Sequence, residues 1–136
     1  MGIANSMVAA VLRSPAHGLL SGSTDLLAYE GRRSGRRIVL PTQYARSGDE
    51  LVILVGRPDT KRWWRNFTEP RDLDVLVAGD WQPMVGQAVV GADAPEVAGP
   101  LLVAYLERFP KAAKVLGEGT DAEQLARAVL VRCRPR

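Results

Sequence analysis

The residues of this sequence best suited to binding chemistry form the stretch Gly31-Arg32-Arg33-Ser34-Gly35-Arg36. Two glycines in a tight turn let backbone N–H groups come close to an anion, and guanidinium groups grip phosphate or carboxylate oxygens with paired hydrogen bonds. The candidate anion ligands in this turn are Arg32, Arg33, Ser34, Gly35 and Arg36. Taken alone, the same pattern also fits a solvated basic turn that binds nothing, so a second signal is needed.

The second signal is the aromatic and basic segment 61–67, which reads KRWWRNF. We expect a short helix here, on which the side chains of Trp63 and Trp64 point about 100° apart. One indole can then pack into the core while the other faces a groove, with the Asn66 amide beside it. The alternative is that both indoles are core. An aromatic plane next to cationic groups suits a ligand with a flat ring and an acidic tail.

Positive charge is concentrated around both features. Between Arg32 and Arg65 there are nine basic and three acidic residues, whereas the whole chain has a formal net charge of only +3. This asymmetry predicts an acidic partner near the segment. Nucleic acid is one such partner and would bind with an affinity that falls steeply with salt. The chain contains no known nucleic-acid-binding motif, so we expect a small acidic ligand and no nucleic acid.

Other kinds of site find no support in the residue inventory. Cys133 and His17 are the only cysteine and histidine, so the chain can form neither an internal disulfide nor a structural zinc site. G-x-S-x-G and P-loop motifs are absent. The stretch 117–122 matches G-x-G-x-x-A, but it follows a helical pattern where a dinucleotide site requires a strand. The patterns therefore identify no metal site and no catalytic residue.

The elements that must position the turn and the aromatic segment have the pattern of β-structure. Apolar runs predict strands over 19–29, 37–45, 51–55, 73–77 and 84–90, most of them joined by tight turns. Pro41 lies inside the second strand, which indicates an edge or a bulge because proline cannot donate a ladder hydrogen bond. Five strands in this order favour an antiparallel barrel over a βαβ sheet.

The second half of the chain has helical patterns. Asp93 with Glu96, and Thr120 with Glu123, are capping-box pairs that each predict the start of a helix. The first helix carries apolar residues on one face. The predicted elements of this half are a helix from Asp93 to a stop at Pro110, a helix over 121–127 and a closing strand over 128–133.

No transmembrane segment is predicted, because no run approaches the roughly 18 apolar residues that a spanning helix needs. The segment 6–13 has apolar residues on one helical face, and we expect it to pack on the barrel, with peripheral membrane contact as the alternative. A single cysteine is compatible with a reducing compartment, and we predict a cytoplasmic protein.

The order of the motifs resembles that of the deazaflavin-dependent nitroreductase family of actinobacteria. The resemblance rests on the run LAYEGRRSG over 27–35, on Pro41, on VGRP over 55–58 and on KRWWRNF over 61–67. It extends from about residue 19 to residue 90, with a looser match in the C-terminal helix and strand. The G-R-x-[ST]-G turn and the W-x-x-N segment carry it together, since either alone is weak.

The resemblance implies a split antiparallel β-barrel with peripheral helices, mainly β within the α+β class, that binds coenzyme F420 and often forms a homodimer. The family's turn holds the coenzyme's phosphate and oligoglutamate tail, and its strand proline lies beside the deazaflavin ring. Together the motifs and the resemblance make the candidate cofactor-binding residues Arg32, Arg33, Ser34, Gly35, Arg36, Pro41, Arg57, Lys61, Trp63 and Asn66. The implied organisation is one split β-barrel domain over 1–136, with an N-terminal helix and lead-in at 1–18, barrel strands at 19–92, helices at 93–127 and a closing strand at 128–134.

The chain departs from the nitroreducing members mainly where they bind substrate. Ile38 replaces an arginine and Gly56-Arg57 replaces a Ser-Lys pair, while the substrate-pocket tyrosines are replaced by Gln43, Phe109, Ala112 and Val115. The implied function is hydride transfer between F420 and a small electrophilic acceptor such as a quinone or activated alkene. FMN or haem in the same barrel, and an F420 carrier without turnover, are the alternatives. The proton donor is open between solvent, Tyr44 and Tyr105.

Overall fold

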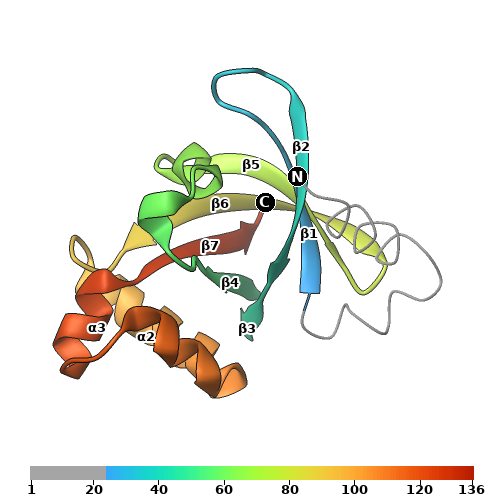
Figure 1. The fold of residues 1–136 in the computed structure, drawn as a ribbon. Coiled ribbons are helices and arrows are strands. Elements are labelled where there is room, and N and C mark those ends of the chain that lie inside the picture. The colour runs from blue at the N-terminus through green and yellow to red at the C-terminus, as the bar shows by residue number, and fades with distance from the viewer. Residues whose placement is uncertain (1–23) are drawn as a thin grey trace.

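Seven strands form one antiparallel sheet in the order β2-β1-β5-β6-β7-β4-β3, which curls into an open half-barrel (Figure 1). The computed structural model describes residues 24–136. The strands are β1 (Thr24–Glu30), β2 (Arg37–Gln43), β3 (Ala45–Ser47), β4 (Glu50–Leu54), β5 (Arg71–Val77), β6 (Asp80–Val90) and β7 (Val129–Pro135). The helices are α2 (Pro95–Arg108) and α3 (Asp121–Arg127), with 3₁₀ segments η2 (Pro58–Thr60), η3 (Trp63–Phe67) and η4 (Pro110–Leu116). This is the mainly β split barrel that the sequence predicted.

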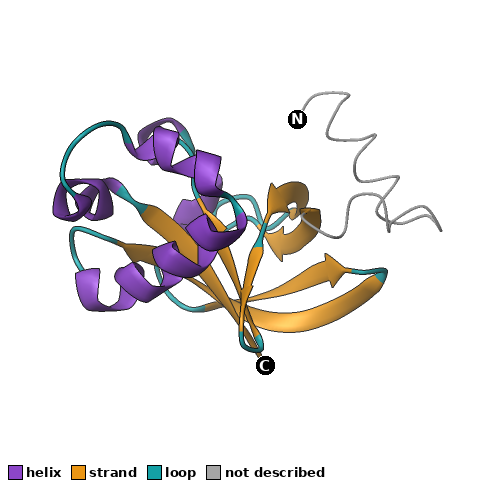
Figure 2. Ribbon diagram, turned by 90° about the horizontal axis from the view of Figure 1, so that it is seen from below, coloured by secondary structure: helices purple, strands orange, loops and turns teal. Residues whose placement is uncertain are grey.

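Two apolar cores lie on the two faces of the curled sheet. Because alternate residues of a strand face opposite sides, Val131 and Cys133 of β7 face the barrel interior while Leu130 packs beneath α2. Figure 2 shows the helices gathered to one side of the strands. The interior core also contains Phe67 of η3, which is fully buried. Phe67 therefore anchors η3 to the barrel.

The predicted strands are present, with a difference at the second. The strand predicted over 37–45 is divided into β2 and β3 at Tyr44, because β2 pairs with β1 at one end of the sheet and β3 pairs with β4 at the other. Pro41 lies in β2, an edge strand, as expected. The helix predicted over 61–67 is not α-helical: it is the 3₁₀ segment η3, preceded by η2.

The two predicted helix starts have different outcomes. Helix α2 begins at Pro95 after Ala94, with no side-chain cap, so the capping box predicted at Asp93 is wrong. Proline is favoured at the first helical position because its fixed φ suits a helix, and a start at Pro95 makes Ala94 the N-cap residue, so Asp93 lies one residue too early to cap the helix. The capping box of α3 is confirmed, because Thr120 and Glu123 exchange two hydrogen bonds of 3.2 Å each.

Several predictions concern residues 1–23, which lie outside the described part of the chain. They include the helix at 6–13, the lead-in up to residue 18, the start of the first strand at residue 19, and His17. Within residues 24–136, none of the helices combines the length and the hydropathy needed to cross a membrane.

Candidate functional site

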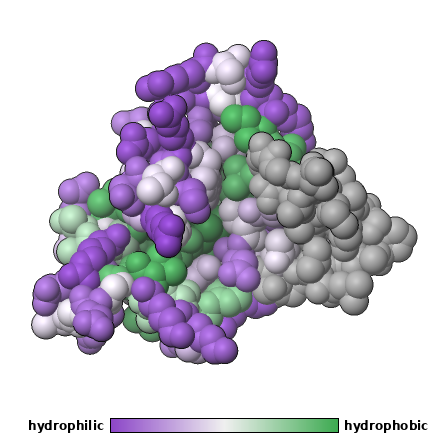
Figure 3. Space-filling model, in the orientation of Figure 1, coloured by the Kyte–Doolittle hydropathy of each residue, from purple (hydrophilic) through white to green (hydrophobic). Residues whose placement is uncertain are grey.

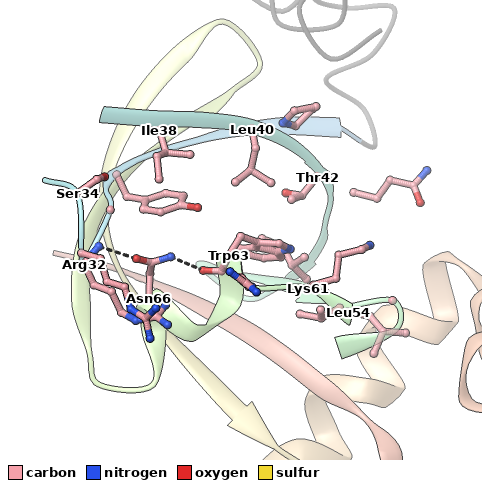
Figure 4. A pocket seen from close by; sticks show the side chains of 18 of the residues that line it. Arg32, Ser34, Ile38, Leu40, Thr42, Leu54, Lys61, Trp63 and Asn66 are labelled. Carbon is pink, nitrogen blue, oxygen red and sulfur yellow. Dashed lines mark hydrogen bonds between the residues drawn. The ribbon is translucent and has the colours of Figure 1, made fainter. Parts of the chain in front are cut away.

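The turn 31–36 and the segment η3 lie side by side, joined by one side chain. The Arg32 N–H donates a hydrogen bond of 2.8 Å to Asn66 Oδ1, between residues 34 positions apart, and Asn66 Nδ2 donates to the Trp63 carbonyl at 2.8 Å (Figure 4). Both ends of the Asn66 amide are thus used to hold the turn against η3. The two features singled out in the sequence belong to one site.

A pocket of about 720 Å³ lies between this pair and strand β2. Ile38, Leu40 and Thr42 alternate along β2 and point into the pocket from one side, and Trp63 and Lys61 face them from the other (Figure 4). On the face seen in Figure 3, apolar residues gather in the middle of the molecule between hydrophilic margins. The volume is within the range of about 300–1,000 Å³ found for small-molecule and cofactor pockets.

Most of the residues predicted from the sequence line this pocket, namely Arg32, Arg33, Ser34, Pro41, Lys61, Trp63 and Asn66. Gly35, Arg36 and Arg57 do not line it. Gly35 has a φ of +67° and gives the turn its left-handed step. Arg57 has a φ of 50° at the start of η2, where its carbonyl accepts two hydrogen bonds from Thr60. These residues shape the segments beside the pocket.

Gly31 allows the turn to close tightly. A Cβ at this position would lie 2.8 Å from Ser34 Oγ and 3.0 Å from Ile38 Cδ1, closer than side chains normally approach. Ser34 Oγ in turn accepts a hydrogen bond of 3.2 Å from the Arg36 N–H. The missing side chain at residue 31 therefore lets the Ser34 hydroxyl fold back between the turn and β2.

The turn has fewer free backbone N–H groups for an anion than we expected from its two glycines. Protein acceptors already take the backbone N–H groups of Gly31, Arg32, Gly35 and Arg36. Within the described residues, the N–H groups of Arg33 and Ser34 donate to no other group. Anion binding at this turn would therefore depend on those two N–H groups, the Ser34 hydroxyl and the guanidinium groups of Arg32 and Arg33.

The two tryptophans diverge as expected. Trp63 lines the pocket and packs edge-on against Phe67, with 6.4 Å between ring centroids. Trp64 instead donates its Nε1–H to the Pro58 carbonyl at 2.9 Å, and the Arg65 guanidinium lies 5.5 Å from its ring centroid. Trp63 is therefore the indole that faces the pocket.

Sequence reasoning missed the strand residues that make the pocket wall, chiefly Tyr29, Leu40 and Thr42, and noted Ile38 only as a replaced arginine. The signal was the two-residue alternation of Ile38, Leu40 and Thr42 along the second strand. Which face of the strand is internal depends on its register with β1, where Tyr29 lies opposite Ile38. No local pattern in the sequence specifies that register.

A second hollow of about 670 Å³ adjoins the first and shares Gln43, Leu54, Gly56 and Tyr105 with it. The rest of its wall comes from the end of α2 and from η4, and the replaced tyrosine positions Phe109, Ala112 and Val115 all lie there. Cationic groups border it at Arg108 and Lys111. The two hollows share four lining residues and lie next to one another between the basic turn and α2.

The tyrosines of the site are neutral donors. Burial raises the pKa of Tyr29 to about 12, with Arg32 opposing the shift, and burial also raises the pKa of Tyr105. Tyr105 lines both hollows, whereas Tyr44 lines neither. Tyr105 is thus the better placed of the two tyrosines considered as proton donors. Residues 24–136 contain no group of three or more His, Cys, Asp or Glu side chains suited to a metal ion.

The donor set fits a flat ring that carries an anionic tail. The wall between Leu40 and Trp63 is apolar and aromatic, which suits a ring, and Arg32 and Arg33 supply positive charge at the turn. Lys61 adds a further cation on the η3 side (Figure 4). The residues present are therefore compatible with a flavin-like or deazaflavin cofactor.

Solved structures with the same fold include redox proteins. A structure described as a domain-swapped dimer has a TM-score of 0.62 and 11% identity, covering 95% of each chain. An F420-H2 dependent reductase, FDR-A, has a TM-score of 0.60 and 14% identity, covering 81% of this chain and 93% of that one. An FAD and haem binding protein from Mycobacterium smegmatis has a TM-score of 0.52 and 18% identity, covering 91% and 67%. No family model and no curated protein matches the chain.

Proposed function

We propose that this protein binds coenzyme F420 in the pocket between β2 and η3 and transfers a hydride between the coenzyme and a small electrophilic acceptor. The observation that carries the proposal is the hydrogen bond from the Arg32 N–H to Asn66, which joins a cationic turn and an indole in one pocket. F420 combines a flat deazaflavin ring with an acidic tail, so it needs both. The shared fold with an F420-H2 dependent reductase supports the same choice.

In this proposal each wall of the pocket has one task. Arg32, Arg33 and Ser34 hold the phosphate and oligoglutamate tail, while Pro41 and Trp63 border the ring. When bound, the reduced coenzyme supplies the hydride, and the protein's part is to orient the reactants and exclude water. The acceptor lies on the open face of the ring, beside Thr42, and extends into the adjoining hollow beneath α2. The mostly apolar wall of that hollow suits a quinone or an activated alkene.

One of the structures that share the fold is an FAD and haem binding protein. FMN or haem is therefore the alternative ligand here, and an F420 carrier without turnover is the alternative role. Cation placement favours F420, because the Arg32–Arg33 pair and Lys61 provide more positive charge than the single phosphate of FMN requires. We also propose a cytoplasmic homodimer, in line with the domain-swapped dimer that shares the fold.

The test is to offer the purified protein F420, FMN and haem separately and to record absorbance spectra after removal of free ligand. We expect retention of F420, and loss of reduced F420 absorbance when quinones and enones are added. A yellow FMN complex or a Soret band without F420 retention would overturn the cofactor assignment. Retention of F420 with no turnover across the acceptor panel would overturn the reductase role and leave a carrier.

A further inference from the structure

One carboxyl group in the barrel interior has no role in the site described so far. Asp25 of β1 is 0% exposed and is the buried acidic residue of the described chain. Its Oδ1 is hydrogen-bonded to the Thr42 hydroxyl on β2, and its Oδ2 has no hydrogen-bond partner within residues 24–136. A buried oxygen without a partner is unusual in folded proteins and calls for an explanation.

The register of β1 and β2 places Asp25 directly behind the pocket wall. The cross-strand pairs Tyr29↔Ile38, Leu27↔Leu40 and Asp25↔Thr42 follow at two-residue steps, so their side chains share one face of the sheet. Tyr29, Ile38, Leu40 and Thr42 line the pocket. Asp25 therefore continues the same inward row, and the Thr42 hydroxyl connects its carboxyl group to a residue that lines the pocket.

The surroundings of Asp25 favour a carboxyl group that exchanges a proton near neutrality. Burial raises the pKa of Asp25 from 3.8 to about 7, and the hydrogen bond from Thr42 opposes the shift. The titratable groups that sense its charge are Tyr105 from α2 and Cys133 from β7, whose own pKa values are raised by burial and by Asp25. Within residues 24–136, no cationic side chain forms a hydrogen bond or an ion pair with Asp25 that could offset the cost of burying its charge.

We propose that Asp25 and Thr42 form a two-residue proton relay that delivers a proton to the acceptor reduced in the pocket. The proposal rests on the reductase function proposed above. Thr42 is the group that touches the acceptor, and Asp25 acts through it. The pair would give the site a stronger acid than its tyrosines, because burial raises the pKa values of Tyr29 and Tyr105 above that of Asp25.

With an activated alkene conjugated to a carbonyl, the reduced coenzyme would supply the hydride: its C–H bond would break, leaving the coenzyme oxidised, and a new C–H bond would form at the β-carbon of the alkene. The alkene electron pair would shift to place negative charge on the carbonyl oxygen. The Thr42 O–H bond breaks as its proton moves to that oxygen, while the Asp25 O–H bond breaks to restore the Thr42 hydroxyl. Asp25 is left as a carboxylate, and water that enters after product release returns the proton through Thr42.

The test compares Asp25→Asn, Thr42→Val and Thr42→Ser with the wild type. Asp25→Asn, at a residue that does not line the pocket, should keep the affinity for F420 measured by fluorescence titration, and the rates of both Thr42 variants are compared at F420 concentrations that saturate each protein. Asp25→Asn and Thr42→Val should lower the rate of acceptor reduction by roughly a hundredfold, within the range typical of general acid catalysis, and Thr42→Ser should retain most of it. The wild-type rate should fall as the pH rises through about 7, and this inflection should be missing in Asp25→Asn.

A second readout needs no coenzyme. Carboxyl ¹³C resonances of Asp25 in the ligand-free protein should titrate near pH 7, and at a higher pH in Thr42→Val, because the hydrogen bond from Thr42 lowers the pKa. Wild-type rates and pH profiles in Asp25→Asn or Thr42→Val, with F420 bound, would overturn the relay while leaving the reductase intact. Absence of F420 binding by the wild type would overturn the proposed function and the relay with it.

Discussion

At the scale of single residues, Asn66 has the most consequence for the site. Within the described residues, its amide makes the side-chain hydrogen bond that links the turn 31–36 to η3: it accepts from the Arg32 N–H and donates to the Trp63 carbonyl. A hydrogen bond of this kind contributes about 1 kcal/mol to stability, but here it also places two walls of a pocket. Changes at residue 66 should therefore affect binding more than folding.

Asn66→Ala should lower the free energy of unfolding by about 1–2 kcal/mol and weaken F420 binding by at least about tenfold, because the turn loses its fixed position. Asn66→Asp keeps the acceptor for the Arg32 N–H but loses the donor to the Trp63 carbonyl, so its effect should be intermediate. Urea unfolding and fluorescence titration measure the two effects. Equal F420 affinity in Asn66→Ala and the wild type would show that the link does not organise the pocket.

Asp25 gives the protein a pH-dependent stability of defined sign. The folded pKa of about 7 exceeds the ordinary value of 3.8, so the folded state binds the proton more tightly and loses stability as the pH rises from about 4 to 7. Asp25→Asn should remove this loss and raise the free energy of unfolding at pH 8 relative to the wild type, by at most about 4 kcal/mol. Urea unfolding at pH 5 and pH 8 measures it. A pH 8 stability below that of the wild type would contradict the prediction.

Gly31 is a residue whose replacement should act on the site. A Cβ at residue 31 would meet Ser34 Oγ at 2.8 Å, so Gly31→Ala should displace the Ser34 hydroxyl and weaken F420 binding. Gly99→Ala, a change within α2, is the matched control, because its Cβ would meet only Leu125 of α3, at an ordinary contact distance of 3.9 Å. The control should stabilise the protein by about 0.5–1 kcal/mol without changing binding. Equal F420 affinity in the two variants would contradict the role assigned to Gly31.

At the scale of elements, local sequence patterns correctly predicted the features that depend on hydrogen bonds between residues close in the chain. The Thr120–Glu123 box marks the first turn of α3 because both of its hydrogen bonds form within four residues. The Asp93 pattern failed because α2 begins at Pro95, which makes Ala94 the N-cap residue and leaves Asp93 outside the cap position. The break at Tyr44 depends on which strands β2 and β3 pair with, and pairing partners are not visible in local periodicity.

The capping box of α3 makes a direct stability test. Thr120→Ala leaves the Glu123 N–H without its acceptor and should lower the free energy of unfolding by about 1 kcal/mol. It should leave F420 binding unchanged, since α3 does not line the pocket. Urea unfolding beside a binding titration checks both parts. A loss of binding in this variant would mean that α3 is coupled to the site.

At the scale of the whole molecule, the sequence predicted the barrel class but only part of the site. Strand lengths, tight turns and a proline inside a strand favoured an antiparallel barrel, since each is a local property, and the split form of the barrel was implied by the family resemblance. The family resemblance predicted that the turn and η3 lie together. The contact that joins them is a hydrogen bond from the Arg32 backbone N–H to the side-chain amide of Asn66. The strand wall of Leu40 and Thr42 was missed, because it is created by the register with β1.

The central claim is that the turn 31–36 and η3 bind one ligand together, and a fluorescence titration with F420 tests it most directly. The wild type should show saturable binding in the micromolar range, and Arg33→Ala and Trp63→Leu should each weaken it by about tenfold. Arg134→Ala, an exposed arginine outside the pocket, should bind like the wild type. No saturation at about 100 μM coenzyme, or equal losses in all three variants, would contradict the account.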